Sequence, residues 1–119
     1  MGYEWFDEYC VSKIGVQKDY KEEWGATRYM IDGKMFLLHG GDQNGKAIIT
    51  VKLEPMNGEM LRSQFTDIIP GYYMNKVHWN SLYLEGSVPD DVVRKMIDES
   101  YSLIMASLPK KVQKALLNL

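Results

Sequence analysis

The segment TRYMIDGKMFLLH, residues 27–39, decides the fold because two apolar runs with a period of two flank a strong turn signal. The runs are Thr27–Ile31 and Met35–His39. Asp32-Gly33 lies between them, and this dipeptide favours a type I′ turn, in which both central residues have positive φ. The segment therefore predicts an antiparallel β-hairpin.

A third strand is predicted at residues 47–53, after a longer turn at residues 40–45 that ends in Asn-Gly. Its side chains alternate between an apolar set, Ala47, Ile49, Val51 and Leu53, and a second set, Lys46, Ile48, Thr50 and Lys52. The alternation predicts that the first set packs on the core and that the second set meets solvent.

Downstream, Glu54-Pro55 ends this strand, and Met60, Leu61 and Phe65 predict a short helix with Pro55 near its first turn. Residues 77–84 predict another strand. One of its faces carries Val77, Trp79, Ser81 and Tyr83, and the other carries His78, Asn80, Leu82 and Leu84. Either face can be the inward one.

Helices are predicted at both ends of the chain. Residues 3–14 repeat apolar side chains at helical spacing, with Gly15 as a C-terminal cap, and the polar residues 16–25 predict a surface connection. Ser87-Val88-Pro89-Asp90 resembles a capping box before a long helix that Pro109 ends. The core-facing stripe of that helix is Val93, Met96, Ile97, Ser100, Ile104 and Leu108.

A short terminal helix is expected within residues 110–119, with Val112 and Leu116 folded back and three lysines exposed. The whole chain, residues 1–119, is therefore expected to form one α+β domain, an antiparallel sheet flanked by N-terminal and C-terminal helices.

The composition of the chain indicates which class of protein it belongs to. The 119 residues are 45% hydrophobic, and no apolar run approaches the roughly 18 residues of a membrane span. We expect a soluble cytoplasmic protein, because the N-terminus lacks the basic region and apolar core of a signal peptide. The single Cys10 cannot form an internal disulfide and is predicted to pack in the core.

The densest set of side chains that both stack and hydrogen-bond lies at residues 69–80, IPGYYMNKVHWN. Trp79 or Tyr73 could offer a stacking face, Lys76 could meet a phosphate, and Asn75 or His78 could contact polar edges. A structural interpretation is equally available. In that interpretation Trp79 fills the core, and Asn75 and Lys76 build a turn before the strand.

Several short motifs, in their order and spacing, resemble the MmcQ/YjbR family. They are Lys34-Met35-Phe36, Lys52-Leu53-Glu54-Pro55, the run from Gly71 to Lys76, His78-Trp79 and Ser100-Tyr101. The resemblance extends from the first helix to Leu108, with Ile14-Gly15 where the family often has Pro-Gly. It implies a small bacterial domain with a frataxin-like (CyaY-like, double-wing) fold, and family members are often labelled DNA-binding.

The resulting hypothesis is a non-catalytic binding module whose partner is nucleic acid. Its candidate contacts are Lys34, Lys52, Tyr73, Asn75, Lys76, His78 and Trp79. Four cations lie on strands or at strand ends, and three of them could share an exposed basic sheet face with Thr50 and Lys76, although an ordinary solvated face is the alternative; the four are Arg28, Lys34, Lys46 and Lys52. A second hypothesis is a small-molecule or protein interaction domain with its ligand beside Tyr73, Asn75 and Trp79.

Enzyme and metal signatures are missing from the sequence. The Gly-rich turn at residues 40–45 lacks the following Lys-Ser/Thr of a phosphate loop, and two separated histidines with one cysteine form no zinc motif. We therefore expect no catalysis, no metal, no cofactor and no membrane partner, and we favour a monomer.

Overall fold

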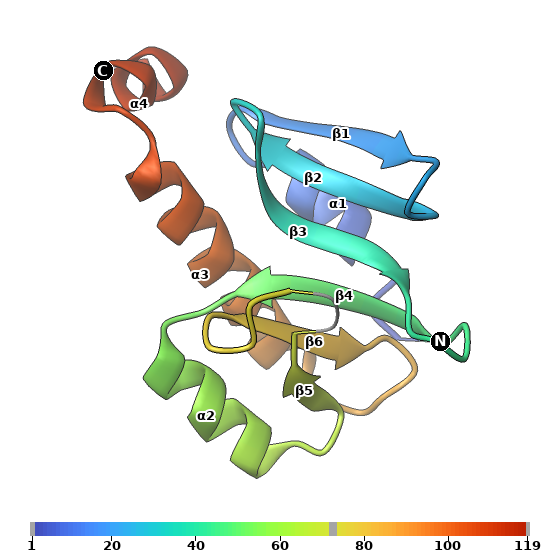
Figure 1. Ribbon diagram of the computed structural model, residues 1–119. Helices are drawn as coiled ribbons and strands as arrows, with labels where there is room; N and C mark the ends of the chain where they lie inside the picture. Colours follow the sequence, from blue (N-terminus) through green and yellow to red (C-terminus); the bar gives the residue numbers. More distant parts are fainter. Residues whose placement is uncertain (1, 72–73, 119) are drawn as a thin grey trace.

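The protein is described by a computed structural model that places residues 2–71 and 74–118. The elements are α1 (Phe6–Val11), β1 (Val16–Lys21), β2 (Ala26–Ile31), β3 (Lys34–Gly41), β4 (Ala47–Lys52), α2 (Pro55–Gln64), β5 (Ile68–Pro70), β6 (Trp79–Tyr83), α3 (Asp90–Ser107) and α4 (Lys110–Leu117). The strands form one six-stranded antiparallel sheet in the order β1-β2-β3-β4-β6-β5 (Figure 1). The predicted α+β class is confirmed.

The hairpin at the centre of the sequence is confirmed. Asp32 and Gly33 have φ values of 49° and 80°, as a type I′ turn requires, and Ile31 pairs with Lys34 across the turn. The register of β2 against β3 shifts between Tyr29 and Met30, which marks a β-bulge. The two predicted strands therefore pair as expected, with one irregularity.

The N-terminal third differs from its prediction. Residues 16–21 form the edge strand β1 instead of a surface connection, and β1 pairs with β2 along its whole length. Most of its side chains are exposed, so no apolar alternation marks it in the sequence. Helix α1 is also shorter than predicted. Tyr3 has a φ of 65° and donates a hydrogen bond to the Val88 carbonyl at 2.6 Å, and Ser12, not Gly15, is the C-cap.

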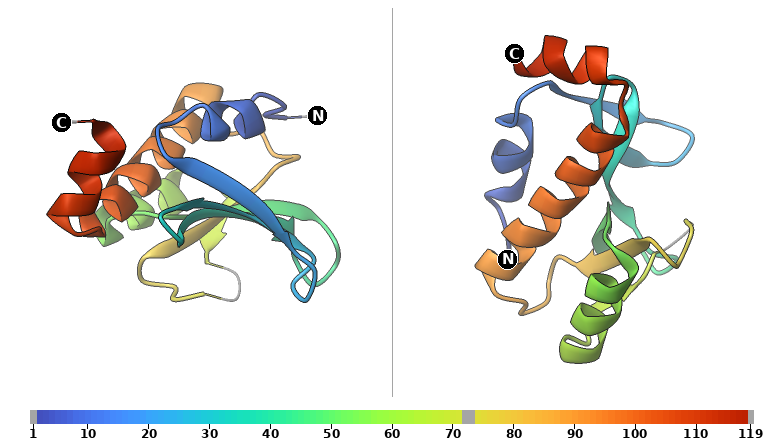
Figure 2. Two further views of the ribbon diagram at one scale, coloured as in Figure 1. Left: turned by 90° about the horizontal axis from the view of Figure 1, so that it is seen from above. Right: turned by 90° about the vertical axis from the view of Figure 1, so that its left-hand side faces the viewer.

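Helices α1 and α3 cover one face of the sheet, and α3 contacts both β3 and β4 (Figures 1 and 2). The predicted stripe of α3 is buried throughout. Ser100 on this stripe donates a hydrogen bond to the Phe36 carbonyl at 2.5 Å and accepts one from the Lys52 amide at 2.8 Å. This hydroxyl therefore joins the helix to two neighbouring strands.

The predicted capping box of α3 is wrong. Pro89 is the N-cap residue, no side chain caps the helix, and the Ser87 amide instead donates to Asp67 at 3.0 Å. Two acidic residues, Asp90 and Asp91, do occupy the first turn, where they complement the positive end of the helix dipole.

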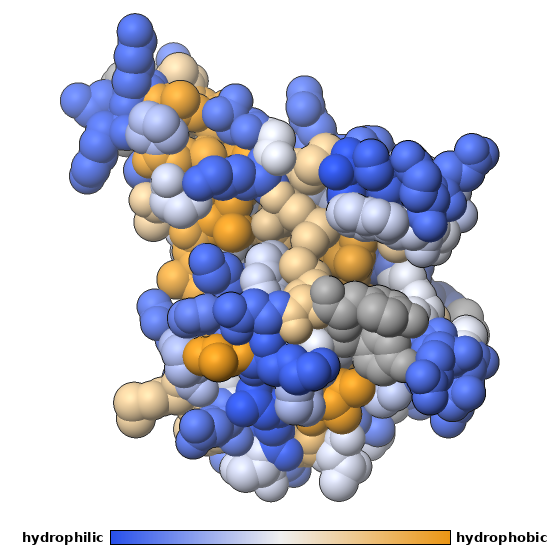
Figure 3. Space-filling view, in the orientation of Figure 1, coloured by the Kyte–Doolittle hydropathy of each residue, from blue (hydrophilic) through white to orange (hydrophobic). Residues whose placement is uncertain are grey.

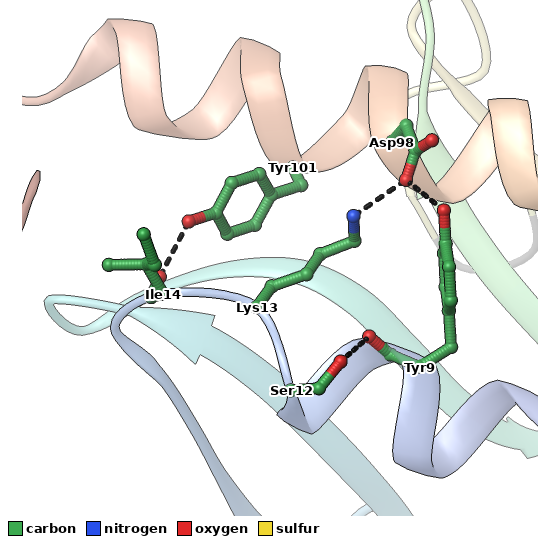
Figure 4. Close-up of polar contacts among 6 residues, drawn as sticks. All are labelled: Tyr9, Ser12, Lys13, Ile14, Asp98 and Tyr101. Atoms are coloured by element: carbon green, nitrogen blue, oxygen red, sulfur yellow. Dashed lines mark hydrogen bonds and ion pairs between the residues drawn. The ribbon is translucent and has the colours of Figure 1, made fainter.

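Polar contacts attach α1 to α3 (Figure 4). One carboxylate oxygen of Asp98 accepts hydrogen bonds from the Tyr9 hydroxyl at 2.7 Å and the Lys13 ammonium at 2.6 Å. Burial, followed by the bond to Asp98, raises the pKa of Tyr9 to about 12. The Tyr101 hydroxyl donates to the Ile14 carbonyl at 2.5 Å. These contacts hold α1 in place despite its length of only 6 residues.

Cys10 and α4 agree with their predictions. Cys10 is fully buried, and burial raises the pKa of its thiol to about 12, which suits packing instead of reactivity. Val112 and Leu116 of α4 pack against the core, and the three lysines of this helix are exposed. None of the helices in the described ranges is long and apolar enough to cross a membrane.

Candidate ligand-binding site

The second face of the sheet carries no helix. Strand pairing places Arg28, Leu38, Thr50 and Ser81 in one row across β2, β3, β4 and β6. The adjacent row contains Gly40, Ile48 and Tyr83. We call this surface the helix-free face. Residues 74–78, drawn in yellow, lie on this side of the sheet, opposite α1 and α3 (Figure 2).

The prediction that the second set of β4 side chains meets solvent is wrong at its centre. Ile48 and Thr50 are only 4% and 1% exposed, although both point to the helix-free face. The strand predicted at residues 77–84 begins only at Trp79, and the preceding residues make a turn beside this face. Asn80, Leu82 and Leu84 form the inward set.

A pocket of about 640 Å³ lies on this face, and we call it the sheet pocket. The described residues that line it are Trp24, Ala26, Met35, Leu38, Gly40, Gly41, Asp42, Ile48, Thr50 and Met74. The space-filling view shows a pale orange apolar band on this face, between the hydrophilic β1–β2 hairpin and a hydrophilic lower region (Figure 3). The pocket is therefore an apolar hollow within a polar surface.

Gly40 allows two strands to approach closely at the pocket wall. A Cβ atom on this residue would lie 3.1 Å from the Cβ of Ala26, which is tighter than ordinary packing. A larger residue here would push β2 and β3 apart or project into the lining. The Gly40-Gly41 pair thus helps to shape the hollow.

The floor of the sheet pocket makes its own hydrogen bond. Thr50 Oγ1 and Ser81 Oγ are 2.7 Å apart and share a hydrogen bond in which either can be the donor. Both residues are buried. The hydroxyl groups of the floor therefore have a hydrogen-bond partner within the protein, and the floor suits an apolar ligand surface.

Asp42 is the only charged residue among the described residues that line the pocket. Its Oδ1 accepts hydrogen bonds from the amides of Asn44 and Lys46, at 2.8 and 2.9 Å, and its Oδ2 accepts one from the Tyr83 hydroxyl at 2.9 Å. The Lys46 amide bond is the main cause that holds the pKa of Asp42 below its usual value. Asp42 is therefore a carboxylate at neutral pH.

Trp24 stands at the mouth of the pocket with 55% of its surface exposed. The Lys21 ammonium and the Arg28 guanidinium lie 5.9 and 5.7 Å from its ring centroid. Arg28 also makes two hydrogen bonds to Asp19, at 2.9 and 2.5 Å. Both cations are thus engaged at the rim instead of lining the pocket.

The predicted site residues that the structure describes fall into three groups. Lys52 and Trp79 pair across β4 and β6 on the helix-free face. His78 directly precedes Trp79, and its carbonyl accepts a hydrogen bond from the Leu53 amide at 2.7 Å. Lys34 lies apart from them, beside the C-terminal end of α3, where it donates to Ser107 at 3.3 Å. Tyr73 lies outside the described residues.

Asn75 and Lys76 serve the turn, as the structural interpretation predicted. Asn75 Oδ1 accepts the Val77 amide at 2.8 Å, and the Lys76 ammonium donates to the Gly71 carbonyl at 2.9 Å. Gly71 is required because a Cβ there would lie 2.7 Å from Trp79. Neither Asn75 nor Trp79 lines the sheet pocket; among the described residues of this segment, Met74 does.

Sequence reasoning missed most of the pocket lining. Met35, Leu38 and Met74 are not among the predicted site residues, because a half-buried apolar residue has the same sequence pattern as a core residue. Trp24 is not among them either, because it lies in the polar stretch predicted as a surface connection. The only local signal was the Gly40-Gly41 pair at the end of a strand.

A second, polar cleft of about 500 Å³ lies where α1 meets β1 and β2. Its centre is Asp7, which accepts hydrogen bonds from the Lys18 ammonium at 2.7 Å and the Tyr29 hydroxyl at 2.6 Å. These bonds, first that of Lys18, hold the pKa of Asp7 below its usual value, while burial lowers the pKa of His39 nearby. Within residues 2–71 and 74–118, no three His, Cys, Asp or Glu side chains form a group that could hold a metal.

The profile of the YjbR family matches residues 11–103. The chain belongs to the YjbR family. It is 32% identical over 112 residues to the uncharacterized protein YjbR of Escherichia coli K12, covering 94% of each chain. It is also 35% identical over 104 residues to the uncharacterized protein YyaQ of Bacillus subtilis, covering 76% of this chain and 87% of that protein.

Solved structures agree with the fold. The crystal structure of the Deinococcus radiodurans protein DR2400 superposes with a TM-score of 0.84 at 24% identity, covering 93% of this chain and 84% of that one. A crystal structure of a Pseudomonas syringae protein superposes with a TM-score of 0.76 at 22% identity, covering 87% and 99%. At this identity, the likeness concerns the fold alone.

Proposed function

We propose that this YjbR-family chain is a non-catalytic binding module that holds a small molecule in the sheet pocket. The observation that carries this proposal is an apolar hollow of about 640 Å³ on the one sheet face that no helix covers. Sites for small molecules commonly have volumes of about 300–1,000 Å³, with apolar walls and few polar groups. The proposal moves the ligand from beside Asn75 and Trp79 onto the strands.

The lining of the sheet pocket contains flexible side chains that can adjust to the shape of a ligand. Met35 and Met74 contribute two unbranched, polarisable side chains, which can adjust to different ligand shapes. Trp24 adds an exposed aromatic surface at the mouth. Together they favour a planar or aromatic body over a sugar-like one.

A neutral fluorescent probe, N-phenyl-1-naphthylamine, tests the proposal. We expect saturable fluorescence enhancement with the unmodified chain and loss of it in Met35→Trp, which fills the pocket. Met56→Trp is the matched control, because Met56 is 84% exposed on α2 and outside the pocket lining. An absence of saturable binding, or equal binding by both variants, contradicts the proposal.

Nucleic acid is the second candidate partner. Lys52 and Trp79 are neighbours on the helix-free face, and neither Lys52 nor Lys76 makes an ion pair within the part of the chain that the structure describes. An ammonium beside an aromatic ring can contact a phosphate and a stacked base. The net charge of −2 and the acidic Glu22-Glu23 turn weaken this candidate.

Fluorescence anisotropy with labelled single-stranded DNA separates the two candidates. Nucleic-acid binding predicts affinity that collapses by about 200 mM salt and is lost in the Lys52→Glu/Lys76→Glu double variant. The control is Lys110→Glu/Lys111→Glu on α4, which changes the charge equally. Equal behaviour of the two double variants, or no binding at low salt, removes this candidate.

The resemblance to MmcQ/YjbR proteins supports two further parts of the proposal, a double-wing relationship to frataxin-like domains and a location in a bacterial cytoplasm. We also propose a monomeric state.

A further inference from the structure

We infer that the sheet pocket selects an aromatic ligand that carries one positive charge, such as an arylalkylamine. The inference rests on the proposed small-molecule function and specifies its ligand class. Its basis is the placement of a single carboxylate, that of Asp42, among the described residues of the lining, which are otherwise uncharged.

Asp42 keeps capacity for a ligand. A carboxylate offers roughly four acceptor positions. Among the described residues, two backbone amides fill positions on Oδ1 and the Tyr83 hydroxyl fills one on Oδ2, so one position on Oδ2 remains. An ammonium group donating to this oxygen would make a charge-assisted hydrogen bond.

The neighbouring cations do not occupy this carboxylate. Lys46 holds Asp42 through its backbone amide. Its positive charge also helps to lower the pKa of Asp42, but its side chain makes no ion pair with Asp42 among the described residues. Arg28 is engaged with Asp19 and the Trp24 ring, and Lys21 lies over the same ring. The charge that a ligand meets inside the pocket is therefore negative.

The rest of the lining receives the aromatic body. Leu38, Ile48 and Met74 offer apolar contact. Because the Thr50 and Ser81 hydroxyls already hydrogen-bond to each other, the floor of the pocket does not require a polar ligand atom. A ligand with one charged end and an otherwise apolar body matches this division. A carboxylate at the same end would face Asp42 with like charge.

Three ligands with the same indole body test the inference: tryptamine, indole-3-propionamide and indole-3-propionate. Binding is followed by chemical-shift changes of the Leu38, Gly40 and Thr50 amides in ¹⁵N-labelled protein. We expect tryptamine to bind at least about tenfold more tightly than indole-3-propionate, with the neutral amide between them.

Asp42→Asn removes the charge while keeping the size of the side chain, and we expect it to abolish the preference for tryptamine. Asp91→Asn is the matched control, because Asp91 lies exposed in the first turn of α3 on the other side of the sheet. Circular dichroism checks that both variants fold.

The possible outcomes distinguish failure of the small-molecule function from failure of the cationic ligand class. If none of the three ligands shifts the pocket amides while N-phenyl-1-naphthylamine still binds, the inference is overturned and the small-molecule function stands. If the naphthylamine probe fails as well, both are overturned. If all three bind alike, if the propionate binds best, or if Asp42→Asn keeps the preference, the function stands and the cationic ligand class is overturned.

Discussion

The side chains of one strand are buried in different ways on the two faces of the sheet. On β4, Ile49 and Val51 pack beneath α1 and α3, while Ile48 and Thr50 form the floor of a hollow on the helix-free face. All four are almost fully buried. Low exposure therefore has two meanings here: close packing on one face, and recess within a pocket on the other.

The largest expected effect compares Ile49→Ala with Ile48→Ala. Ile49→Ala should lower the free energy of unfolding by about 2–5 kcal/mol, because it opens a cavity in a packed core. Ile48→Ala should lower it by only about 1–2 kcal/mol, because one side of Ile48 already borders empty space. Urea denaturation measures both, and equal losses would show that the two faces are packed alike.

A smaller loss is expected where α3 joins the sheet. Ser100→Ala should lower the free energy of unfolding by about 1–3 kcal/mol, because it removes the partner of the buried Lys52 amide. Ser102→Ala is the control, since Ser102 is exposed on the same helix. A loss as small as that of the control would mean that water replaces the Ser100 hydroxyl.

The polar cleft beneath α1 should give the helix-covered side a pH dependence. The folded pKa of Asp7 is lowered, so its contribution to stability is present above its unfolded value of about 4 and is lost as pH falls through the folded pKa. The difference in unfolding free energy between the unmodified chain and Asp7→Asn should be below about 1 kcal/mol at pH 7, since the carboxylate is half exposed.

The difference in unfolding free energy between the unmodified chain and Asp7→Asn should shrink towards pH 3. Denaturation curves at several pH values test it, with Asp91→Asn as the reference for a general charge effect. A difference that grows in acid would contradict the assigned role of Asp7.

The smallest effect is expected at the rim of the helix-free face. Arg28→Ala should lower the midpoint of thermal unfolding only slightly, because the Arg28 and Asp19 side chains are 23% and 44% exposed and water screens their ion pair. Differential scanning calorimetry checks this expectation. A clear fall in the midpoint would show that the rim contributes to the stability of the fold as well as to the shape of the pocket mouth.

The elements that could be predicted are those in which buried side chains recur at regular intervals along the sequence or a turn has characteristic residues. The hairpin at Asp32-Gly33 and the α3 stripe were found because local turn chemistry and a 3.6-residue period each point to one structure. Strand β1 was missed because an edge strand with polar side chains is specified by backbone pairing, which the sequence pattern does not display.

The candidate site was predicted less well than the fold. Lys52, Asn75, Lys76, His78 and Trp79 do lie near one another, yet the pocket is lined by apolar residues that alternate as core residues do. Which apolar residues border a hollow depends on how the strands and the segment at Met74 meet across the sheet. That arrangement is tertiary, and no local spacing encodes it.

The hydroxyl of Ser100 has a consequence for dynamics. Because the Lys52 amide is held by a helix instead of a neighbouring strand, its exchange with deuterium must wait until α3 separates from the sheet. The exchange rate of this single hydrogen thus reports how often the helical layer opens, even while the hydrogen bonds between strands stay closed.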